Sequence, residues 1–337
     1  MRTVSNPPNP FESQHRELLE PSRPAKLTVY EDETREILSR NDSPDLPFRW
    51  SVNPYRGCFH GCAYCYARSS HEYWGFGAGT DFESKIIVKE DAPRLLRQAF
   101  DRPSWSGELI VFSGNTDCYQ PLEATYGLTR ACVSVCVEYR NPIGVITKGA
   151  LVLRDIDILK QLSDNAWVQV YLSIPFASDD VARKVEPHAP SITKRFETIQ
   201  ALADAGIATG ISIAPVIPGL TEGDIPELLD RARRAGARSS TYSLLRLSGS
   251  VESVFWDRMR EAFPERIGKI ANRLRAVRGG VLTESRFFRR QAGEGPYGEL
   301  VEQLFALAKR RTGFPEQDRT AIPQTFRRPW SEQASLF

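Results

Sequence analysis

Three closely spaced cysteines are the most reactive feature of this sequence. Cys58, Cys62 and Cys65 have the spacing C-x3-C-x2-C within the stretch RGCFHGCAYCYAR. Thiolates packed this closely on one loop are soft ligands that can converge on an iron–sulfur cluster. Three thiolates leave one iron of a four-iron cluster open to a small molecule, as in a catalytic metal site. Gly57 and Gly61 each directly precede one of these cysteines and allow the backbone to turn tightly.

Two other roles for the cysteines stay open. A zinc site could take His60, His71 or Cys118 as its fourth ligand, although the second C-x2-C pair of a zinc ribbon is missing. That site would make the chain a zinc-stabilised nucleic-acid-binding module without catalysis. Structural disulfides are less favoured, because three adjacent cysteines cannot all pair and we see no export signal.

The residues around the cysteines resemble a known family. Tyr64 stands just before the last cysteine, and the strings NPYRGC, HGC and YCYAR enclose the motif. This pattern resembles the radical S-adenosylmethionine (SAM) superfamily, and within it the branch related to spore photoproduct lyase, whose members are often called DNA repair photolyase-like. The resemblance extends from about Ser39 to about Arg311. The motif is specific for the superfamily and much less specific for any one reaction.

The resemblance implies a set of cofactors and a class of reaction. A [4Fe-4S] cluster would bind SAM through its amino nitrogen and carboxylate oxygen at the open iron. One electron from a donor such as flavodoxin or ferredoxin would break a carbon–sulfur bond. The resulting 5′-deoxyadenosyl radical would abstract a hydrogen atom from a substrate that the sequence does not identify. DNA photoproduct repair is the alternative within this family, and in either case the protein orients the cofactors and excludes water.

Alternating strands and helices must position this site. Apolar runs predict strands at 48–53, 109–113, 143–147, 167–174, 207–216 and 240–247, with helices at 92–100, 122–139, 156–162, 192–205 and 225–235. Parallel strands joined by right-handed crossovers predict an α/β fold, a partial (β/α)6 TIM-like barrel. Ligands bind at the carboxyl ends of such strands, and the cysteine loop follows the first strand directly.

We expect four parts along the chain. Residues 1–45 are rich in Pro, Ser, Asn and charge and should be an extended or disordered segment, with a short strand at 27–30. The radical SAM core should span 46–250. A helical C-terminal extension, with two helices broken at Pro264, should span 251–312, and 313–337 should be a flexible tail.

Polar residues gather after the second strand. Ser113, Asn115, Thr116 and Asp117 stand where many relatives have Gly-Gly-Glu holding the SAM amino group. This chain departs from that pattern, as the spore photoproduct lyase branch also does, so the resemblance implies that Thr116 or Asp117 is the substitute. A capping turn before the next helix explains the same residues equally well.

Later strand ends add further candidates for cofactor binding. The related lyases have a lysine at the position of Lys148, which implies that it neutralises the SAM carboxylate; a solvated surface lysine is the alternative. Ser173 could reach the ribose hydroxyls. Pro215 belongs to an apolar stretch that could cover the adenine or could simply form a turn.

Aromatic and basic residues near the barrel mouth complete the candidates. The resemblance implies that Tyr64 and Tyr66 of the cysteine loop lie beside the cofactors. Tyr242 and Arg246 on the sixth strand could face the substrate, although Tyr242 could equally belong to the core. The run RFFRR at 286–290 could grip nucleic acid, but such runs are more often solvated helix faces.

Three cysteines lie outside the cluster motif. Cys118 is expected in a loop at the catalytic mouth, where its thiol could return a hydrogen atom to a product radical; the alternative is a small packed residue. Spore photoproduct lyase uses a cysteine in this general region, but Gly114 or Asn115 stands at the matching place here, which puts thymine-dimer repair in doubt. Cys132 and Cys136 should be buried as small apolar residues on one helix face.

Bulk composition sets broader limits. The chain has 337 residues and a net charge of +2, from 44 basic and 42 acidic residues, so no overall field favours nucleic acid or membrane. We expect no transmembrane helix and no signal peptide, and therefore a cytoplasmic protein with reduced thiols.

Overall fold

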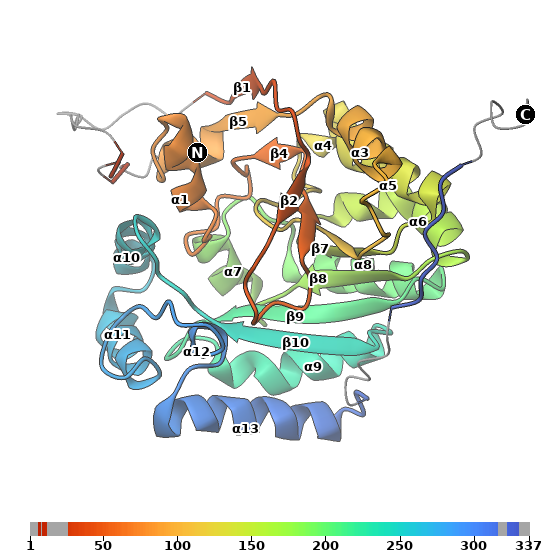
Figure 1. The fold of residues 1–337 in the computed structure, drawn as a ribbon. Coiled ribbons are helices and arrows are strands. Elements are labelled where there is room, and N and C mark those ends of the chain that lie inside the picture. Colours follow the sequence, from red (N-terminus) through yellow and green to blue (C-terminus); the bar gives the residue numbers. More distant parts are fainter. Residues whose placement is uncertain (1–5, 8, 12–25, 316–321, 330–337) are drawn as a thin grey trace, which may run out of the picture.

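A seven-stranded sheet forms the centre of the molecule in the computed structural model, which describes residues 6–7, 9–11, 26–315 and 322–329 (Figure 1). Its strand order is β10-β9-β8-β7-β6-β3-β2, and all neighbours are parallel except the edge strand β2. The strands are β2 (Leu38–Arg40), β3 (Trp50–Val52), β6 (Ile110–Phe112), β7 (Ile143–Thr147), β8 (Val168–Ser173), β9 (Thr209–Val216) and β10 (Ser239–Leu244). The predicted partial parallel barrel is therefore confirmed, with an added antiparallel strand at one edge.

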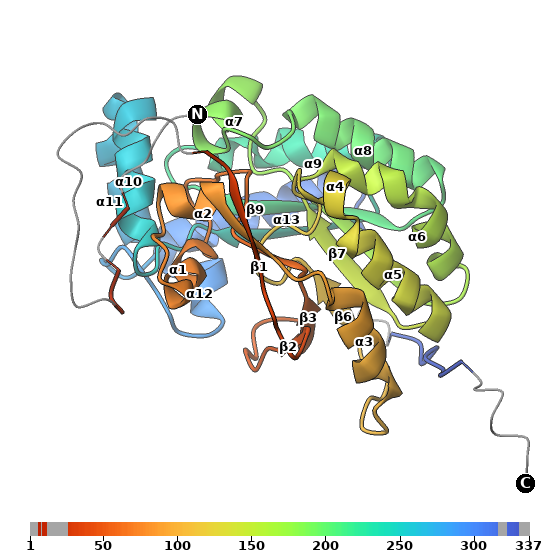
Figure 2. The ribbon, with the colours of Figure 1, turned by 90° about the horizontal axis from the view of Figure 1, so that it is seen from above.

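Helices surround the outer side of this sheet in an arc (Figure 2). They are α3 (Ala92–Asp101), α5 (Leu128–Tyr139), α6 (Ile156–Ser163), α8 (Ile192–Asp204) and α9 (Ile225–Arg234). The central strands are almost continuously apolar and buried, as is typical of a parallel sheet. The prediction of a single helix over 122–139 is wrong, because two helices occupy this range. Gly127 adopts a left-handed φ of 63°, which ends α4 (Glu123–Tyr126) before α5 begins.

A second, three-stranded sheet lies beside the barrel. Its order is β1 (Thr28–Glu31), β5 (Lys85–Val88) and β4 (Tyr55–Arg56). The short helices α1 (Arg68–His71) and α2 (Thr80–Ser84) separate β4 from β5 in the sequence. The cysteine loop runs between β4 and α1 and bonds to α2 through the amide of Cys58, so the small sheet and its helices support the loop.

The C-terminal part covers β9 and β10. It contains α10 (Val251–Ala262), α11 (Ile267–Ala276), α12 (Arg289–Ala292) and α13 (Gly295–Arg311), with the expected interruption at Pro264. Short 3-10 helices occur at Glu72–Trp74, Ala150–Asp155, Glu222–Asp224 and Pro264–Arg266. Within the described ranges, no helix combines the length and the apolar character needed to cross a bilayer.

The expectation of a flexible tail is wrong for part of the C-terminal segment. Phe326 stacks on Tyr139 with ring centroids 6.0 Å apart and meets Phe100 edge-on. A Cβ on Gly107 would lie 2.1 Å from that of Phe326, so this close approach requires glycine. The guanidinium of Arg328 donates to three carbonyl oxygens at the end of α3 and in the turn after it, at 2.7 to 3.0 Å. Residues 325–328 are therefore part of the folded structure.

Candidate functional site

The three cysteines of the motif lie together on the loop that precedes α1. All are free, and Cys58 and Cys62 are each only 6% exposed. Burial raises the pKa of Cys58 well above its ordinary value, and Asp117 and then the thiols of Cys62 and Cys65 add to this effect. The thiols are thus within electrostatic range of one another. Ionising all three requires a cation to neutralise them, which is what a bound metal cluster supplies.

This donor set fits an iron–sulfur cluster. In the described residues, no three His, Cys, Asp or Glu side chains are arranged to hold a single metal ion. A cluster does not need that arrangement, because each thiolate can bind a different iron atom. Three sulfur donors on one short, rigid loop match the softness that iron–sulfur clusters prefer.

A buried arginine fixes the backbone of the cysteine loop. The Arg68 side chain is fully buried and donates to the carbonyl oxygens of Cys62 at 2.9 Å and Gly61 at 3.0 Å. It also donates to the carboxylate of Glu83 at 2.5 Å. Arg258 of α10 donates to the same Glu83 oxygen at 2.6 Å, so the loop is tied to the C-terminal helices. The cysteine loop is therefore held by charge-assisted bonds from outside the barrel.

Glycine is required at the turn into the first cysteine. Gly57 has a φ of +74°, and a Cβ there would lie 2.9 Å from the carbonyl oxygen of Lys85. The amide of Cys58 donates to the carbonyl of Phe82 at 2.9 Å, which fixes the loop against α2. Gly61 also has a positive φ, of +66°, so the tight turns predicted at both glycines are confirmed.

The polar residues after β6 are bonded within the protein. Ser113 accepts a hydrogen bond from the amide of Cys118 at 2.9 Å, and Asn115 donates to the hydroxyl of Ser70 at 3.2 Å. The hydroxyl of the buried Thr116 donates to the carbonyl of Tyr55 at 2.9 Å. These contacts join the end of β6 to the two ends of the cysteine loop.

Asp117 connects the end of β6 to the end of β7. One carboxylate oxygen accepts from the hydroxyl of Thr147 at 2.6 Å, and the other accepts from the amide of Lys148 at 2.7 Å. His60 Nδ1 lies 3.4 Å from the second oxygen. Burial would raise the pKa of Asp117, but His60 and these donors hold it well below its ordinary value. Asp117 is therefore a fixed anion behind the cysteine loop.

Lys148 lies inside the site, so the alternative of a solvated surface lysine is wrong. Its ammonium donates to the hydroxyl of Ser173 at 3.1 Å and lies 3.8 Å from a carboxylate oxygen of Glu186. The same ammonium is 5.6 Å from the centre of the Tyr64 ring. Burial acts to lower the pKa of Lys148, but Cys62 and Glu186 outweigh it and raise the value overall. Three of the predicted site residues, Lys148, Ser173 and Tyr64, are thus brought together.

Sequence reasoning missed the two residues that complete this cluster. Glu186 follows α7 (Asp179–Val185), is buried, and bonds to the hydroxyl of Tyr64 and the guanidinium of Arg195. The amide of Ala63 donates to the carbonyl of Val185 at 2.9 Å, so this segment docks directly on the cysteine loop. The sequence offers only one hint of this residue, an acidic side chain in the segment that follows the fourth strand. Its role could not be read from local spacing, because Glu186 and its partner Tyr64 are 122 positions apart in the sequence.

Of the other residues predicted to belong to the site, some lie at the strand ends or on the surface and one packs against a helix. Pro215 lies at the end of β9, and Ser173 donates to the neighbouring carbonyl of Ala214 at 3.2 Å, so the ends of β8 and β9 meet there. Tyr66 is 52% exposed, and its hydroxyl donates to the carbonyl of Gly114 at 3.0 Å. Tyr242 packs on Phe305 of α13 at 4.6 Å, so the idea that it faces the substrate is wrong.

Cys118 is not displayed at the mouth of the barrel. Its side chain is 0% exposed and belongs to the apolar core, and its carbonyl accepts from the hydroxyl of Thr129 at 2.7 Å. The prediction that Cys118 is accessible at the mouth, on which its catalytic role depended, is therefore wrong, because the side chain after Asp117 is buried in the core. Cys132 and Cys136 are fully buried, as expected.

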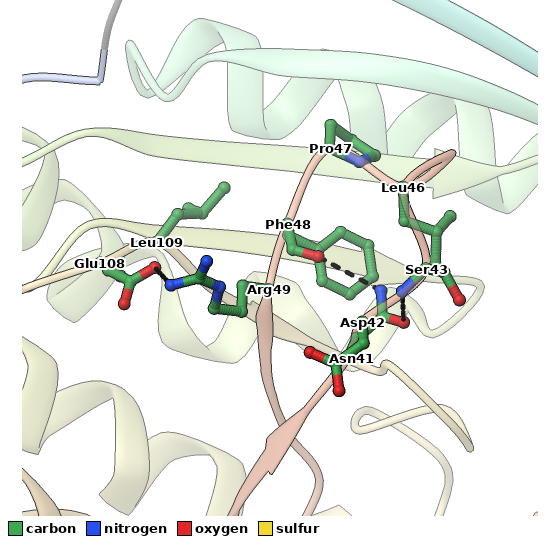
Figure 3. Close-up of a pocket in the computed structure, with 9 residues that line it drawn as sticks. All are labelled: Asn41, Asp42, Ser43, Leu46, Pro47, Phe48, Arg49, Glu108 and Leu109. Atoms are coloured by element: carbon green, nitrogen blue, oxygen red, sulfur yellow. Dashed lines mark hydrogen bonds and ion pairs between the residues drawn. The ribbon is translucent and has the colours of Figure 1, made fainter.

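A surface depression elsewhere does not belong to this site. It is formed by the loop between β2 and β3 together with the residues before β6, and its lining includes Asn41, Phe48, Arg49 and Glu108 (Figure 3). Arg49 is paired with Glu108 at 3.4 Å. None of the lining residues belongs to the cysteine loop or to the cluster around Lys148, so we assign no function to this depression.

The family model of the radical SAM superfamily matches residues 52–232. The chain belongs to the radical SAM superfamily. An uncharacterized protein of Mycobacterium tuberculosis (strain H37Rv) is 33% identical over 294 residues, which cover 87% of this chain and 83% of the relative. A radical SAM Nα-GlyT isomerase of Pseudomonas phage M6 is 29% identical over 219 residues, covering 64% of this chain and 43% of the isomerase.

Solved structures support the same radical SAM fold. A spore photoproduct lyase variant with bound AdoMet and dinucleoside spore photoproduct matches with a TM-score of 0.61 and 15% identity, covering 85% of this chain and 79% of that chain. The lyase complexed with dinucleoside spore photoproduct matches with a TM-score of 0.60 and 16% identity over the same shares. The protein is therefore an enzyme of this superfamily, and membership implies SAM, an iron–sulfur cluster and a reductant.

Proposed function

We propose that this radical SAM enzyme holds a [4Fe-4S] cluster on Cys58, Cys62 and Cys65 and cleaves SAM reductively to abstract a hydrogen atom from a substrate. The observation that carries the proposal is the set of three free, mostly buried thiols on a loop clamped by Arg68. When bound, the cluster supplies the electron that breaks the carbon–sulfur bond of SAM. The electron reaches the site from a one-electron donor such as flavodoxin or ferredoxin.

The side chains beside the cysteine loop bind and orient SAM. The ammonium of Lys148, held by Ser173 and by the carboxylate of Glu186, is a preorganised cation for the SAM carboxylate. Thr116 and Asp117 orient the amino end of SAM, Asp117 by fixing the backbone at Lys148. Tyr64 and Pro215 supply the apolar walls, and Ser173 offers a hydroxyl to the ribose.

The surroundings of the loop also exclude water. Lys148, Glu186 and Arg195 are all largely or fully buried, so their charges interact in a medium of low dielectric constant. Tyr66 bonds to the carbonyl of Gly114 and so links the cysteine loop to the end of β6. A reactive intermediate formed here would be sheltered from solvent on the barrel side.

The alternative of DNA photoproduct repair gains no support from the site. That reaction would need a hydrogen donor at the mouth, and the candidate thiol, Cys118, is buried in the core. The spore photoproduct lyase structures share the fold at 15–16% identity, which supports the architecture and not the substrate. We therefore leave the substrate open in the proposed function.

Anaerobic reconstitution tests the proposal. Wild-type protein should take up iron and acid-labile sulfide and release 5′-deoxyadenosine from SAM when reduced. Cys62→Ala should lose most of the iron and sulfide, because the two remaining thiolates hold a cluster poorly. Cys132→Ala is the matched control: it removes a buried thiol in α5 and should keep a full cluster. A full cluster in Cys62→Ala, or stoichiometric zinc without sulfide in wild type, would contradict the proposal.

A further inference from the structure

A partly buried arginine follows the carboxyl end of β10 and has no bonding partner among the described residues. Arg246 follows β10 after one intervening residue, and it makes no hydrogen bond or ion pair with any other residue of the described part. Its guanidinium is within electrostatic range of Arg290, Tyr66 and Asp45. Burial, and then the charge of Arg290, lower the pKa of Arg246, while Tyr66 and Asp45 act in the opposite direction without outweighing them. The carboxylate of Asp45 is already bonded to Arg290, so the partly desolvated guanidinium of Arg246 would be stabilised further by an anion bound directly to it.

The backbone around Arg246 is held in place by buried bonds. Arg278 is buried and donates to the carbonyl oxygens of Leu245 at 2.9 Å and Arg289 at 2.8 Å. Two residues beyond Arg246, the carbonyl of Ser248 accepts from the hydroxyl of Ser69 on α1 at 3.3 Å. The backbone on either side of Arg246 is therefore bonded to Arg278 and to α1.

The arginines near Arg246 are already neutralised. Arg286 donates to Glu284 at 2.8 Å, Arg289 to Glu294 at 2.8 Å, and Arg290 to Asp45 at 2.6 Å. Among these described arginines, Arg246 is therefore the one whose guanidinium is available to bind a ligand. The exposed rings of Phe287 and Phe288 border the same stretch of chain.

Arg246 is also within electrostatic range of the cysteine loop. Tyr66 directly follows Cys65, and its hydroxyl bonds to Gly114 at the end of β6. The electrostatic interaction between Arg246 and Tyr66 therefore places a cation from the segment after β10 near the residue that follows Cys65. The SAM carboxylate has its own cation in Lys148, at the ends of β7 and β8.

We propose that Arg246 binds an oxyanion of the substrate, a carboxylate or a phosphate, and holds the substrate at the mouth of the barrel beside the cysteine loop. The planar guanidinium presents parallel donors that match the two oxygens of such a group. Only the description of the ligand as substrate rests on the proposed function. Compounds without an anionic group would be poorly held, so Arg246 would determine substrate specificity.

Site-resolved modification by phenylglyoxal, an arginine-selective reagent, tests this inference on the full chain. Modification of Arg246, read by mass spectrometry, should slow when inorganic phosphate or acetate is added. For a dissociation constant of about 10 mM, 100 mM of the probe slows it roughly tenfold. The phosphate arm and the acetate arm then show which oxyanion is preferred. Arg238, an exposed arginine before β10, is the control and should react equally under all conditions.

The outcomes separate this inference from the proposed function, because the measurement needs neither cluster nor SAM. Protection of Arg246 by phosphate or acetate, with Arg238 unchanged, supports an oxyanion site. Equal modification of Arg246 with and without both probes would overturn it. Protection by SAM in reconstituted protein, with none by either small anion, would also overturn it, since Arg246 would then belong to the cofactor site. Arg246→Ala should keep its SAM affinity within about twofold of wild type.

Discussion

Lys148 shows how a single side chain acquires a function from its surroundings. In the sequence it is one of nine lysines, and in the structure its ammonium lies beside Ser173, Glu186 and the face of Tyr64. The anion Glu186 is already shared with Arg195, so the positive charge of Lys148 is not cancelled. A buried ammonium with surplus charge is a strong partner for an incoming carboxylate.

Replacing Lys148 should weaken SAM binding. A charge-assisted contact to a carboxylate contributes about 1.5–3 kcal/mol, so Lys148→Ala should raise the SAM dissociation constant roughly ten- to a hundredfold. Equilibrium dialysis with the reconstituted protein measures this directly. Lys160→Ala is the control, because Lys160 is an exposed residue of α6 paired with Asp164 at 2.5 Å. Unchanged affinity in Lys148→Ala would show that the carboxylate is held elsewhere.

Individual site residues could be predicted from the sequence where short-range spacing identifies them. The three cysteines and the glycines before two of them are visible in one short motif, and so is a lysine after a strand. Glu186 and Arg195 were missed because burial and pairing across distant segments leave no local pattern. Cys118 was misplaced for the same reason, since the sequence does not show whether a loop turns outward or inward.

The small sheet is the element that carries the cysteine loop, and it contains a buried charge. Lys89 follows β5 directly and is only 5% exposed. Burial, and then Arg56 on β4, lower the pKa of Lys89 to about 8, while Asp32 opposes this. The charged form is therefore less stable in the folded protein than in the unfolded chain, where a lysine has a pKa of about 10.4.

Lys89→Met should have a pH-dependent effect on stability. At pH 7 the lysine is charged in both states, so the methionine variant should be more stable by about 1–3 kcal/mol. Between about pH 8 and 10.4 the folded lysine loses its proton first and the unfolded state binds more protons, so wild type gains stability as pH rises. The advantage of the variant should therefore shrink by pH 10. Urea unfolding of the apo protein at pH 7, 8.5 and 10 measures it, and a constant difference would refute the expectation.

Helices and strands with a long hydrophobic repeat were predicted well, and the residues at which they end were predicted less well. The six parallel strands follow from the alternating strand and helix patterns. The break at Gly127 and the edge strand β2 were not predicted, because a left-handed glycine and a three-residue strand give weak sequence signals. The ordered residues 325–328 were missed because a polar segment with one aromatic residue does not reveal what Phe326 covers.

For the whole molecule, the open side of the barrel matters most. A partial barrel has two free edges, here β10 and β2. Asp45, in the loop after β2, accepts two hydrogen bonds from Arg290 of α12, which packs beside β10 (Figure 1). Both side chains are largely buried, and the amide of Phe288 also donates to Asp45 at 3.1 Å. This pair joins the two edges next to Arg246.

Breaking this pair should loosen the segment before α13. Removing one partner of a buried pair costs about 3–5 kcal/mol, so Asp45→Asn should speed tryptic cleavage at residues 286–290 by at least about tenfold. Arg290 lowers the pKa of Asp45, so the contribution is fully present above about pH 3.9 and lost only as pH falls further. Digestion at pH 8 therefore measures it in full.

Asp42→Asn is the matched control for that experiment. Asp42 lies in the same loop, its side chain is 75% exposed, and it pairs with Arg40 at 2.8 Å. Its replacement should leave cleavage unchanged, since exposed pairs contribute little. Similar cleavage rates for Asp45→Asn and Asp42→Asn would mean that the segment is held by other contacts, such as those of Arg278.

The packing of Phe326 against Phe100 and Tyr139 has a consequence for biosynthesis. The ribosome makes every strand of both sheets before it reaches Phe326, so a nascent chain can assemble its barrel while this aromatic surface is still uncovered. Translation that stops short of residue 325 would release a chain with its cysteine loop in place and an exposed apolar patch under α3 and α5. In the cell, such products would be substrates for chaperones and proteases.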